Sequence, residues 1–350
     1  MRATSKLSAD FLPPTLSTYL LFPLPSCRAS PTFLQSFATR PALLKNPPIY
    51  VETLIRCPMD ALWDHTQQPD LHQQWDLRFT EIRYLPRSVD SEPQRFLYAT
   101  RIGFGLGVAG RGESVGTKEK NGERTSVLKF WSDEWLSLIQ TGAGYWKYVP
   151  TPEGLRFLTG YDYQTRFGAP GRVLDRLAFR PLMGWATAWS FDCLRLWLEK
   201  GIKPSASIRL AIIQLVVRLV LSFCWIYQGV VPKLLYPDTG ELSILQGAGF
   251  TAEAARYVAS AVGVGEIVFG LLFWLLPLRY LRPVYWLNML GLVVLGLGAI
   301  FSQPAIFVAP FNPVTLNASM LVLAAVGLLS LDDLPSARNC LRQPPPMAPV

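Results

Sequence analysis

Residues 208–231 read IRLAIIQLVVRLVLSFCWIYQGVV, an apolar run with Arg209 at its start and Arg218 near its middle. A run of this length can cross the hydrocarbon core of a bilayer as a helix. An arginine at the centre of a spanning helix costs roughly 2.5 to 3.5 kcal/mol on insertion scales, so such side chains usually face a partner or a cavity. The stretch therefore predicts a membrane span whose charged side faces the protein interior.

Three more apolar stretches follow, and turns containing proline, arginine or polar residues separate them. They cover residues 257–276, 284–301 and 314–331. Basic residues precede the first stretch and follow the second, whereas the turn between the third and fourth carries no charge. Since basic loops stay in the cytoplasm, both ends of this region are expected there. We predict an all-α four-helix transmembrane bundle over residues 204–333.

The part of the chain before residue 204 has the mixed charge and periodicity of a water-soluble domain. A strand near residues 49–55 ends at Pro58, two short helices follow, and several alternating stretches predict an antiparallel sheet. A long helix then runs to Lys200, is interrupted at Pro181 and is closed by Gly201. We predict an α+β soluble domain over residues 47–203.

Both chain ends are expected to lack a fold of their own. The first 46 residues carry five basic residues, one acidic residue and many Ser, Thr and Pro without a period. They predict a disordered or wrongly assigned N-terminal extension, and a short signal peptide or a transit peptide stays open as an alternative. Residues 334–350 are predicted to be a disordered tail.

Composition argues against several kinds of protein. The net charge is +8, but the basic residues form no long run and no nucleic-acid motif accompanies them. Five cysteines without a CxxC motif and only two histidines indicate no metal site and no disulfide framework. The segment from Gly105 to Gly110 matches G-x-G-x-x-G, but strand-like sequence follows it where a helix would be needed, so it predicts a curved strand.

The first span has one polar stripe. At 100° per residue, Gln214, Arg218, Ser222, Trp225 and Gly229 share a face. The second span contains one acid, Glu266, with small residues on the same side that allow close helix approach. We predict an ion pair between Arg218 and Glu266, with Gln214 and Asn288 completing its hydrogen bonds. Three alternatives stay open: an ion pair that only fixes helix register, a ligand or proton site, and an arginine whose side chain reaches the membrane surface without a partner.

Pro58 after the first strand and the sequence PDLHQQW at residues 69–75 give this domain a family likeness. The order of elements over residues 48–200 resembles the SRPBCC superfamily of START and polyketide-cyclase-like proteins. The resemblance implies a helix-grip fold, in which a curved sheet wraps the long helix and leaves a pocket for an apolar ligand. Most of the aromatic residues could instead fill the core. The candidate pocket residues are Trp75, Trp131, Tyr145, Trp146, Tyr161, Trp185 and Trp189.

The membrane half contains Arg218, WIYQGVVPK at residues 225–233, Gly263-x-x-Glu266 and FNPVTLNASMLVLA before the last helix. With these motifs, residues 207–331 resemble the DoxX-like family. Together with RPLMGWATAWSFD at residues 180–192, the membrane half resembles a fusion found in bacteria, which implies an inner-membrane protein with a redox-associated role. No catalytic residue set transfers with the likeness. The full predicted intramembrane polar site is Gln214, Arg218, Ser222, Trp225, Gly229, Lys233, Glu266, Asn288 and Asn317.

These observations predict a membrane protein whose cytoplasmic domain binds an apolar small molecule or membrane lipid and is coupled to the bundle. One alternative is a quinone-linked oxidoreductase subunit, since a quinone is the cofactor that the resemblance allows. The sequence has no haem, flavin or iron-sulfur motif, so electrons would come from a membrane redox partner or the quinone itself. Another alternative is a structural subunit, or a homo-oligomer, without a ligand of its own. Intrinsic enzymatic activity is the less favoured interpretation.

Overall fold

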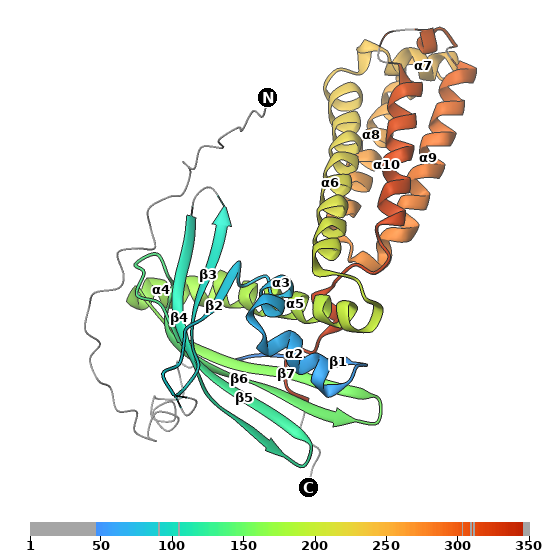
Figure 1. Cartoon of the computed structure of the whole chain (residues 1–350). Helices are drawn as coiled ribbons and strands as arrows, with labels where there is room; N and C mark the ends of the chain where they lie inside the picture. Colours follow the sequence, from blue (N-terminus) through green and yellow to red (C-terminus); the bar gives the residue numbers. More distant parts are fainter. Residues whose placement is uncertain are drawn as a thin grey trace, which may run out of the picture. The chain divides into compact units, whose positions relative to one another are not determined.

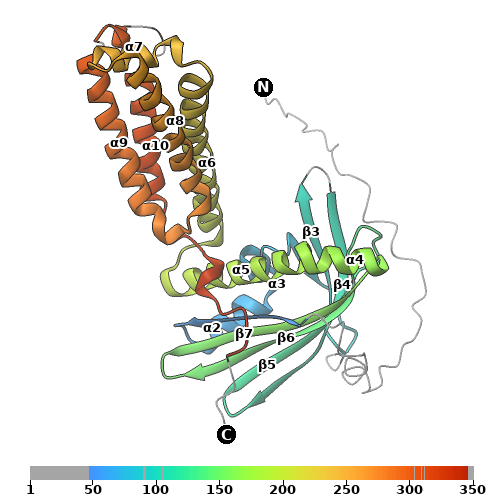
Figure 2. The same cartoon turned by 180° about the vertical axis from the view of Figure 1, so that it is seen from behind.

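The structure is a computed structural model that describes residues 47–89, 92–103, 106–302, 304–308, 310 and 312–345. Figures 1 and 2 show an antiparallel sheet with helices and a separate group of long helices (Figure 1, Figure 2). The predictions for residues 1–46 lie outside the described residues.

The soluble part is built on one sheet in which every neighbouring pair of strands is antiparallel. The strand order is β1-β7-β6-β5-β4-β3-β2, so β1 and β2 are the edges. Two short helices, α2 (Met59–Gln67) and α3 (Pro69–Trp75), connect these two edges along the chain. The remaining bounds are β1 Ile49–Ile55, β2 Glu81–Tyr84, β3 Arg95–Gly103, β4 Leu106–Lys120, β5 Glu123–Trp131, β6 Ile139–Thr151 and β7 Gly154–Thr165.

A long helix follows the sheet and runs in three segments, α4 (Gly168–Leu174), η2 (Asp175–Phe179) and α5 (Arg180–Lys200). The middle segment is a π-helix that ends at Phe179, two residues before Pro181. A proline inside a helix clashes with the carbonyl four residues earlier, and the wider π turn relieves that clash. Gly201 ends α5 in the left-handed conformation, with φ of 69°. The predicted α+β helix-grip domain is confirmed.

The core of this domain lies between one face of the sheet and α5. Alternate residues of β6 and β7 point to that face, as the period of two in a strand requires. Phe157 stacks on Phe191 of α5 with ring centroids 4.4 Å apart, and Trp146 and Tyr148 pack beside Phe157. Each such fully buried side chain stabilises the fold by roughly 1.5 to 3 kcal/mol.

Glycines on the inner face make room for aromatic rings from neighbouring strands. A Cβ atom on Gly110 of β4 would lie 2.3 Å from the ring of Tyr98 and 2.6 Å from the carbonyl oxygen of Trp131. On Gly107 of the same strand the nearest atom would be a carbonyl oxygen 3.3 Å away. The described part of the G-x-G-x-x-G segment is therefore strand, and its glycine at residue 110 is required by packing.

Replacing Gly110 with alanine is expected to destabilise the sheet domain by about 1 to 3 kcal/mol, because neither the Trp131 backbone nor the packed Tyr98 ring can move freely. Gly107→Ala is the matched control on the same strand and is expected to cost under about 1 kcal/mol. Thermal unfolding of the purified variants measures both effects. Equal losses for the two variants would contradict this packing role.

Among the described residues, the membrane half contains four long helices. They run side by side in both views (Figure 1, Figure 2). Within the part of the chain that the structure describes, three helical segments are long and apolar enough to cross a membrane: Pro204–Leu235, Ala252–Leu275 and Leu278–Ser302. The helix Pro313–Leu329 is shorter. The four-helix architecture is confirmed, with one helix below ordinary spanning length. The bounds are α6 Pro204–Gln228, η3 Gly229–Leu235, η4 Pro237–Thr239, α7 Glu241–Gly247, α8 Ala252–Leu275, η5 Leu278–Tyr280, α9 Leu281–Ser302, η6 Pro304–Val308 and α10 Pro313–Leu329.

The chain after α10 returns to the sheet domain. Ala337 and Cys340 are buried in the same core cluster as β1 and α5, and Leu341 forms two backbone hydrogen bonds of 2.9 Å with Glu52 on the edge strand. The short helix η7 (Ala337–Asn339) lies between these contacts. The prediction of a disordered tail is therefore wrong for residues 334–345. The burial of two small side chains and the pairing with a free strand edge order this segment.

Candidate functional site

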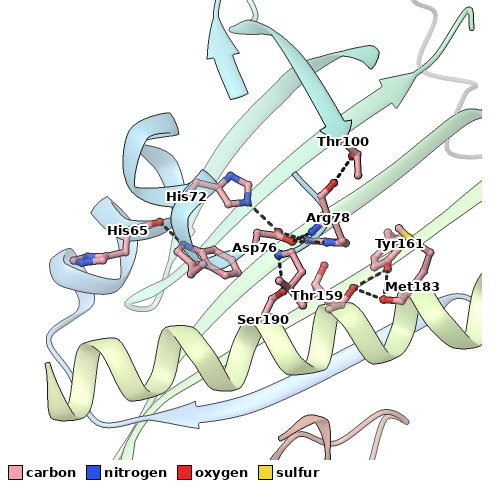
Figure 3. Close-up of polar contacts among 12 residues, drawn as sticks. His65, His72, Asp76, Arg78, Thr100, Thr159, Tyr161, Met183 and Ser190 are labelled. Carbon is pink, nitrogen blue, oxygen red and sulfur yellow. Dashed lines mark hydrogen bonds and ion pairs between the residues drawn. The ribbon is translucent and has the colours of Figure 1, made fainter. Parts of the chain in front are cut away.

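A charged cluster lies in the aromatic interior of the sheet domain, around the carboxylate of Asp76 (Figure 3). Nε of Arg78 donates to Oδ1 of Asp76 at 2.9 Å, and Nη2 donates to Oδ2 at 2.6 Å. Nε2 of His72 donates to Oδ2 at 3.1 Å. The Asp76 side chain is fully buried, and only 10% of the Arg78 and 12% of the His72 side chain is exposed. The cluster is a bidentate ion pair between Arg78 and Asp76, and the imidazole of His72 forms a further hydrogen bond with the same carboxylate.

Aromatic rings surround these polar groups. The guanidinium carbon of Arg78 lies 5.4 Å from the ring centroids of both Phe79 and Tyr161. The imidazole of His72 contacts Trp75 and Trp146 with centroid distances of 5.0 and 4.9 Å. The positive charge therefore lies against electron-rich ring faces, which attract it.

The backbone that carries the cluster is fixed from two sides. Leu77 N donates to Ser190 Oγ of α5 at 2.9 Å, and Thr100 Oγ1 of β3 donates to the carbonyl oxygen of Arg78. Asp76 follows α3 directly, so its position is set by the end of that helix. The segment after α3 thus connects the long helix to the far half of the sheet (Figure 3).

The electrostatics of the cluster favour a charged Asp76 and a neutral His72. Burial acts to raise the pKa of Asp76, but the charge and hydrogen bonds of Arg78, with the hydrogen bond from His72, outweigh it and hold this pKa well below its usual range. Burial lowers the pKa of His72, and the neighbouring Asp76 only partly opposes that shift. The ion pair is therefore formed throughout the physiological range.

His72 is expected to reduce the stability of the sheet domain as the pH falls below about 6.5, the ordinary histidine pKa. Below that pH the unfolded chain takes up a proton on His72, while the folded chain does not until its lowered pKa is reached, so unfolding is favoured. His72→Gln keeps a donor and removes this titration. The unfolding midpoints of the wild type and of His72→Gln should approach each other as the pH is lowered from 7.5 to 5, because the wild type loses stability faster. Parallel curves would contradict the assignment.

The predicted pocket aromatics divide into two groups. Trp75, Trp146, Tyr161 and Trp189 are buried in the core cluster, and Tyr161 shares a 2.9 Å hydrogen bond with Thr187 of α5. The other three are more accessible: Trp131 is half-buried, and Tyr145 and Trp185 are exposed. The buried four lie in the same core cluster, and His72 contacts two of them.

The predicted ion pair between Arg218 and Glu266 is not formed. Nε of Arg218 donates to the carbonyl oxygen of Phe273 at 2.5 Å, and its guanidinium lies 5.7 Å from the ring centroid of Trp274. Both residues belong to the last turn of α8, whose carbonyls lack partners within the helix. The positive charge therefore caps the C-terminal end of that helix.

Helix register explains this error. Gly229 and Gly263 bring the backbones of η3 and α8 into direct contact, since a Cβ on Gly229 would lie 2.4 Å from the carbonyl oxygen of Gly263. This contact sets Arg218 opposite the end of α8 and leaves Glu266 about two turns away, roughly 12 Å along the axis.

Glu266 instead pairs with Lys233. Nζ of Lys233 lies 3.2 Å from Oε2 of Glu266 and 3.0 Å from Oε1 of Glu241 at the start of α7. The lysine and Glu266 side chains are 10% and 8% exposed. One ammonium group therefore stands between two carboxylates at the end of the bundle where the π-helix η3 contains Pro232.

The other predicted polar residues form separate contacts. Gln214 donates to the carbonyl oxygen of Gly327 and to Ser330 Oγ, at 2.5 and 2.9 Å. Trp225 Nε1 donates to Asn288 Oδ1 at 2.7 Å. In a further contact, Asn317 donates to the carbonyl oxygen of Leu292 at 3.3 Å. Ser222 is buried where α6 meets Gly270 of α8. The polar stripe thus divides into local contacts that join pairs of helices.

Comparison with known proteins places the chain in a family. It is 42% identical over 302 residues to the uncharacterized membrane protein YndG of Bacillus subtilis, covering 86% of this chain and 99% of YndG. The chain belongs to the YndG family. The DoxX-like family matches residues 222–325. This YndG-family protein is therefore a membrane protein with a DoxX-like region, as predicted. In the same chain an antiparallel sheet domain with a long helix precedes that region.

Solved structures resemble the sheet domain only distantly. A STAR-related lipid transfer protein from Xanthomonas axonopodis is 14% identical, covering 43% of this chain and 85% of its own, with a TM-score of 0.34. The Zhui aromatase/cyclase from Streptomyces sp. R1128 is 10% identical, covering 42% and 95%, with a TM-score of 0.30. With TM-scores this low, neither protein indicates what the YndG-family chain binds.

Sequence reasoning missed the Asp76 cluster and the lysine as the partner of Glu266. The sequence DLR at residues 76–78, directly after an apolar-faced helix, contains a carboxylate and a guanidinium two residues apart. That spacing is common on protein surfaces, so it carries no signal of burial by itself. Among the described residues, no group of three or more His, Cys, Asp or Glu side chains is arranged to hold a metal ion.

Proposed function

We propose that the sheet domain binds an apolar molecule that carries one polar headgroup, and that Arg78 recognises this headgroup. The observation that carries the proposal is the ion pair of Asp76 and Arg78 within an aromatic interior. Apolar side chains of similar volume often stabilise a core as well as a buried ion pair does, so stability alone gives little reason to keep one. Asp76 engages Nε and Nη2, and the Tyr161 hydroxyl also hydrogen-bonds to the guanidinium. In this proposal a remaining guanidinium N–H donates to the ligand.

The membrane provides the source of such a molecule. α5 ends at Lys200 and α6 begins at Pro204, so the sheet domain is tied to the bilayer by a very short linker. An apolar ligand can then pass between membrane and domain without crossing much water. Membrane lipids and membrane-soluble small molecules are the ligand classes that fit.

Mass spectrometry of the purified protein tests this function. The wild type is expected to retain a defined amphiphile that Asp76→Leu/Arg78→Leu lacks. Unfolding midpoints show whether the double variant keeps its fold, and His65→Gln, on the neighbouring helix α2, serves as a matched control. An identical lipid profile in a folded double variant would contradict the proposal.

The contacts of the tail support four membrane crossings. Residues before α6 and residues after α10 pack into the same core cluster, so both must be on one side of the membrane. An odd number of crossings would separate them, and α10 is therefore the fourth span in this proposal. The positive-inside rule then assigns both ends to the cytoplasm. Protease treatment of sealed inner-membrane vesicles should cut tags at residue 47 and residue 350 from the same side; opposite sides would contradict it.

A second candidate function, proton-coupled quinone chemistry, is favoured by one observation. Lys233 stands between the carboxylates of Glu241 and Glu266, an arrangement with one more negative than positive charge when all three groups are ionised. Such a site can exchange a proton. Quinone reduction by the protein in nanodiscs, alone and with membrane extract, should depend on Glu266 if this function holds, and an unchanged rate in Glu266→Gln would exclude it.

A further inference from the structure

One face of the helix that follows the sheet carries large exposed apolar side chains. Val173 and Leu174 lie at the end of α4, Leu177 lies in η2, and Leu182 and Trp185 lie in the first turns of α5. Their exposed fractions run from 44% at Trp185 to 76% at Leu177. The junction residues keep right-handed helical dihedrals, so the segments form one helix and these side chains recur at helical spacing.

The charges beside this face are of one sign. Arg172 and Arg176 are exposed, whereas Asp175, the acidic residue of α4 and η2, is buried against Tyr163 and Arg180. An apolar stripe flanked by arginines, with a tryptophan at one end, has the composition of helices that lie in a membrane interface. A free apolar surface of this kind in water would promote aggregation.

We propose that the surface formed by Val173, Leu174, Leu177, Leu182 and Trp185, with Arg172 and Arg176, lies in the anionic headgroup region of the bilayer that the same chain spans. The arginines complement lipid phosphates, and their aliphatic stems cover the apolar stripe. The helix is anchored at its other end, because α5 is joined to α6 by three residues, Gly201, Ile202 and Lys203. α5 is roughly 30 Å long at 1.5 Å per residue. With α5 parallel to the membrane surface, its N-terminal end and the adjoining α4 lie in the interface, as its C-terminal end next to α6 does.

This inference is independent of the ligand proposed for Arg78 and of the chemistry at Lys233. It concerns only how the exposed helix face meets lipid. A failure of ligand binding would leave it intact, and its own failure would leave the buried cluster unaffected.

Fluorescence quenching in nanodiscs tests the inference on the full chain. A fluorescent amino acid replaces Leu177, or Val115 on β4 as a matched control, which is 48% exposed on the sheet. Each disc holds one chain and lipids with brominated acyl chains. The label at residue 177 is expected to lose most of its emission when anionic lipid is present, and the label at residue 115 is expected to keep it. Arg172→Glu/Arg176→Glu should remove most of the difference.

Two results would overturn the inference. One is equal emission at residues 177 and 115 in every lipid mixture. The other is shielding of residue 177 only in discs that hold two chains, which would assign the surface to a second copy of this protein. Since all the substituted side chains are exposed, unfolding midpoints are expected to stay at the wild-type value and verify that the variants are folded.

Discussion

Asp76→Ala is expected to destabilise the sheet domain by roughly 3 to 5 kcal/mol, because it leaves the Arg78 guanidinium buried without its counter-ion. For a domain of this size the unfolding midpoint should fall by on the order of 10 °C. Thermal unfolding followed by near-UV circular dichroism measures the loss. Asp70→Ala on α3 is the control, since Asp70 is exposed and its removal should change the midpoint little.

The double variant separates the structural role of this ion pair from its role in recognition. Asp76→Leu/Arg78→Leu removes both charges, so most of the stability lost in Asp76→Ala should return. If the double variant were as unstable as the single one, the loss would come from the contacts of His72 or of the backbone rather than from an unpaired charge. If the double variant regains stability but does not retain the ligand, the ion pair serves ligand binding rather than stability.

Lys233→Met is expected to have the second large effect, a loss of roughly 3 to 5 kcal/mol in the bundle, because two carboxylates would then face each other without a cation. Glu266→Gln should be much milder, since Lys233 keeps Glu241 as its partner. We therefore predict that Lys233→Met lowers the stability of the bundle more than Glu266→Gln does.

Fluorescence-detected size exclusion after heating in detergent provides the measurement for the bundle. Lys233→Arg keeps the charge and is the matched control, expected to lie near the wild type. Arg218→Leu tests the arginine in the middle of α6. It removes the cap at the C-terminal end of α8 and should lower the stability of the bundle by about 1.5 to 3 kcal/mol, the ordinary value for a hydrogen bond from a charged group. A larger loss for Glu266→Gln than for Lys233→Met would contradict the assigned geometry.

Several properties of this protein follow from local sequence. The lengths of the apolar runs predict the helices of the bundle, because crossing a bilayer requires a minimum number of apolar residues. The interruption at Pro181 and the end at Gly201 follow from the backbone restrictions of those two residues. Alternation and turn signals predict the antiparallel sheet. Each of these depends only on residues that are close in the chain.

Tertiary structure alone decides which distant groups meet. The stripe of Gln214, Arg218 and Trp225 was visible on a helical wheel, but a wheel gives rotation and not the offset along the axis. Contacts between glycine backbones set that offset, which places Arg218 about two helical turns from Glu266 and leaves Lys233 as the partner of Glu266. The same limit applies to Asp76 and to Cys340 in the tail, because burial depends on what the rest of the chain packs against a residue.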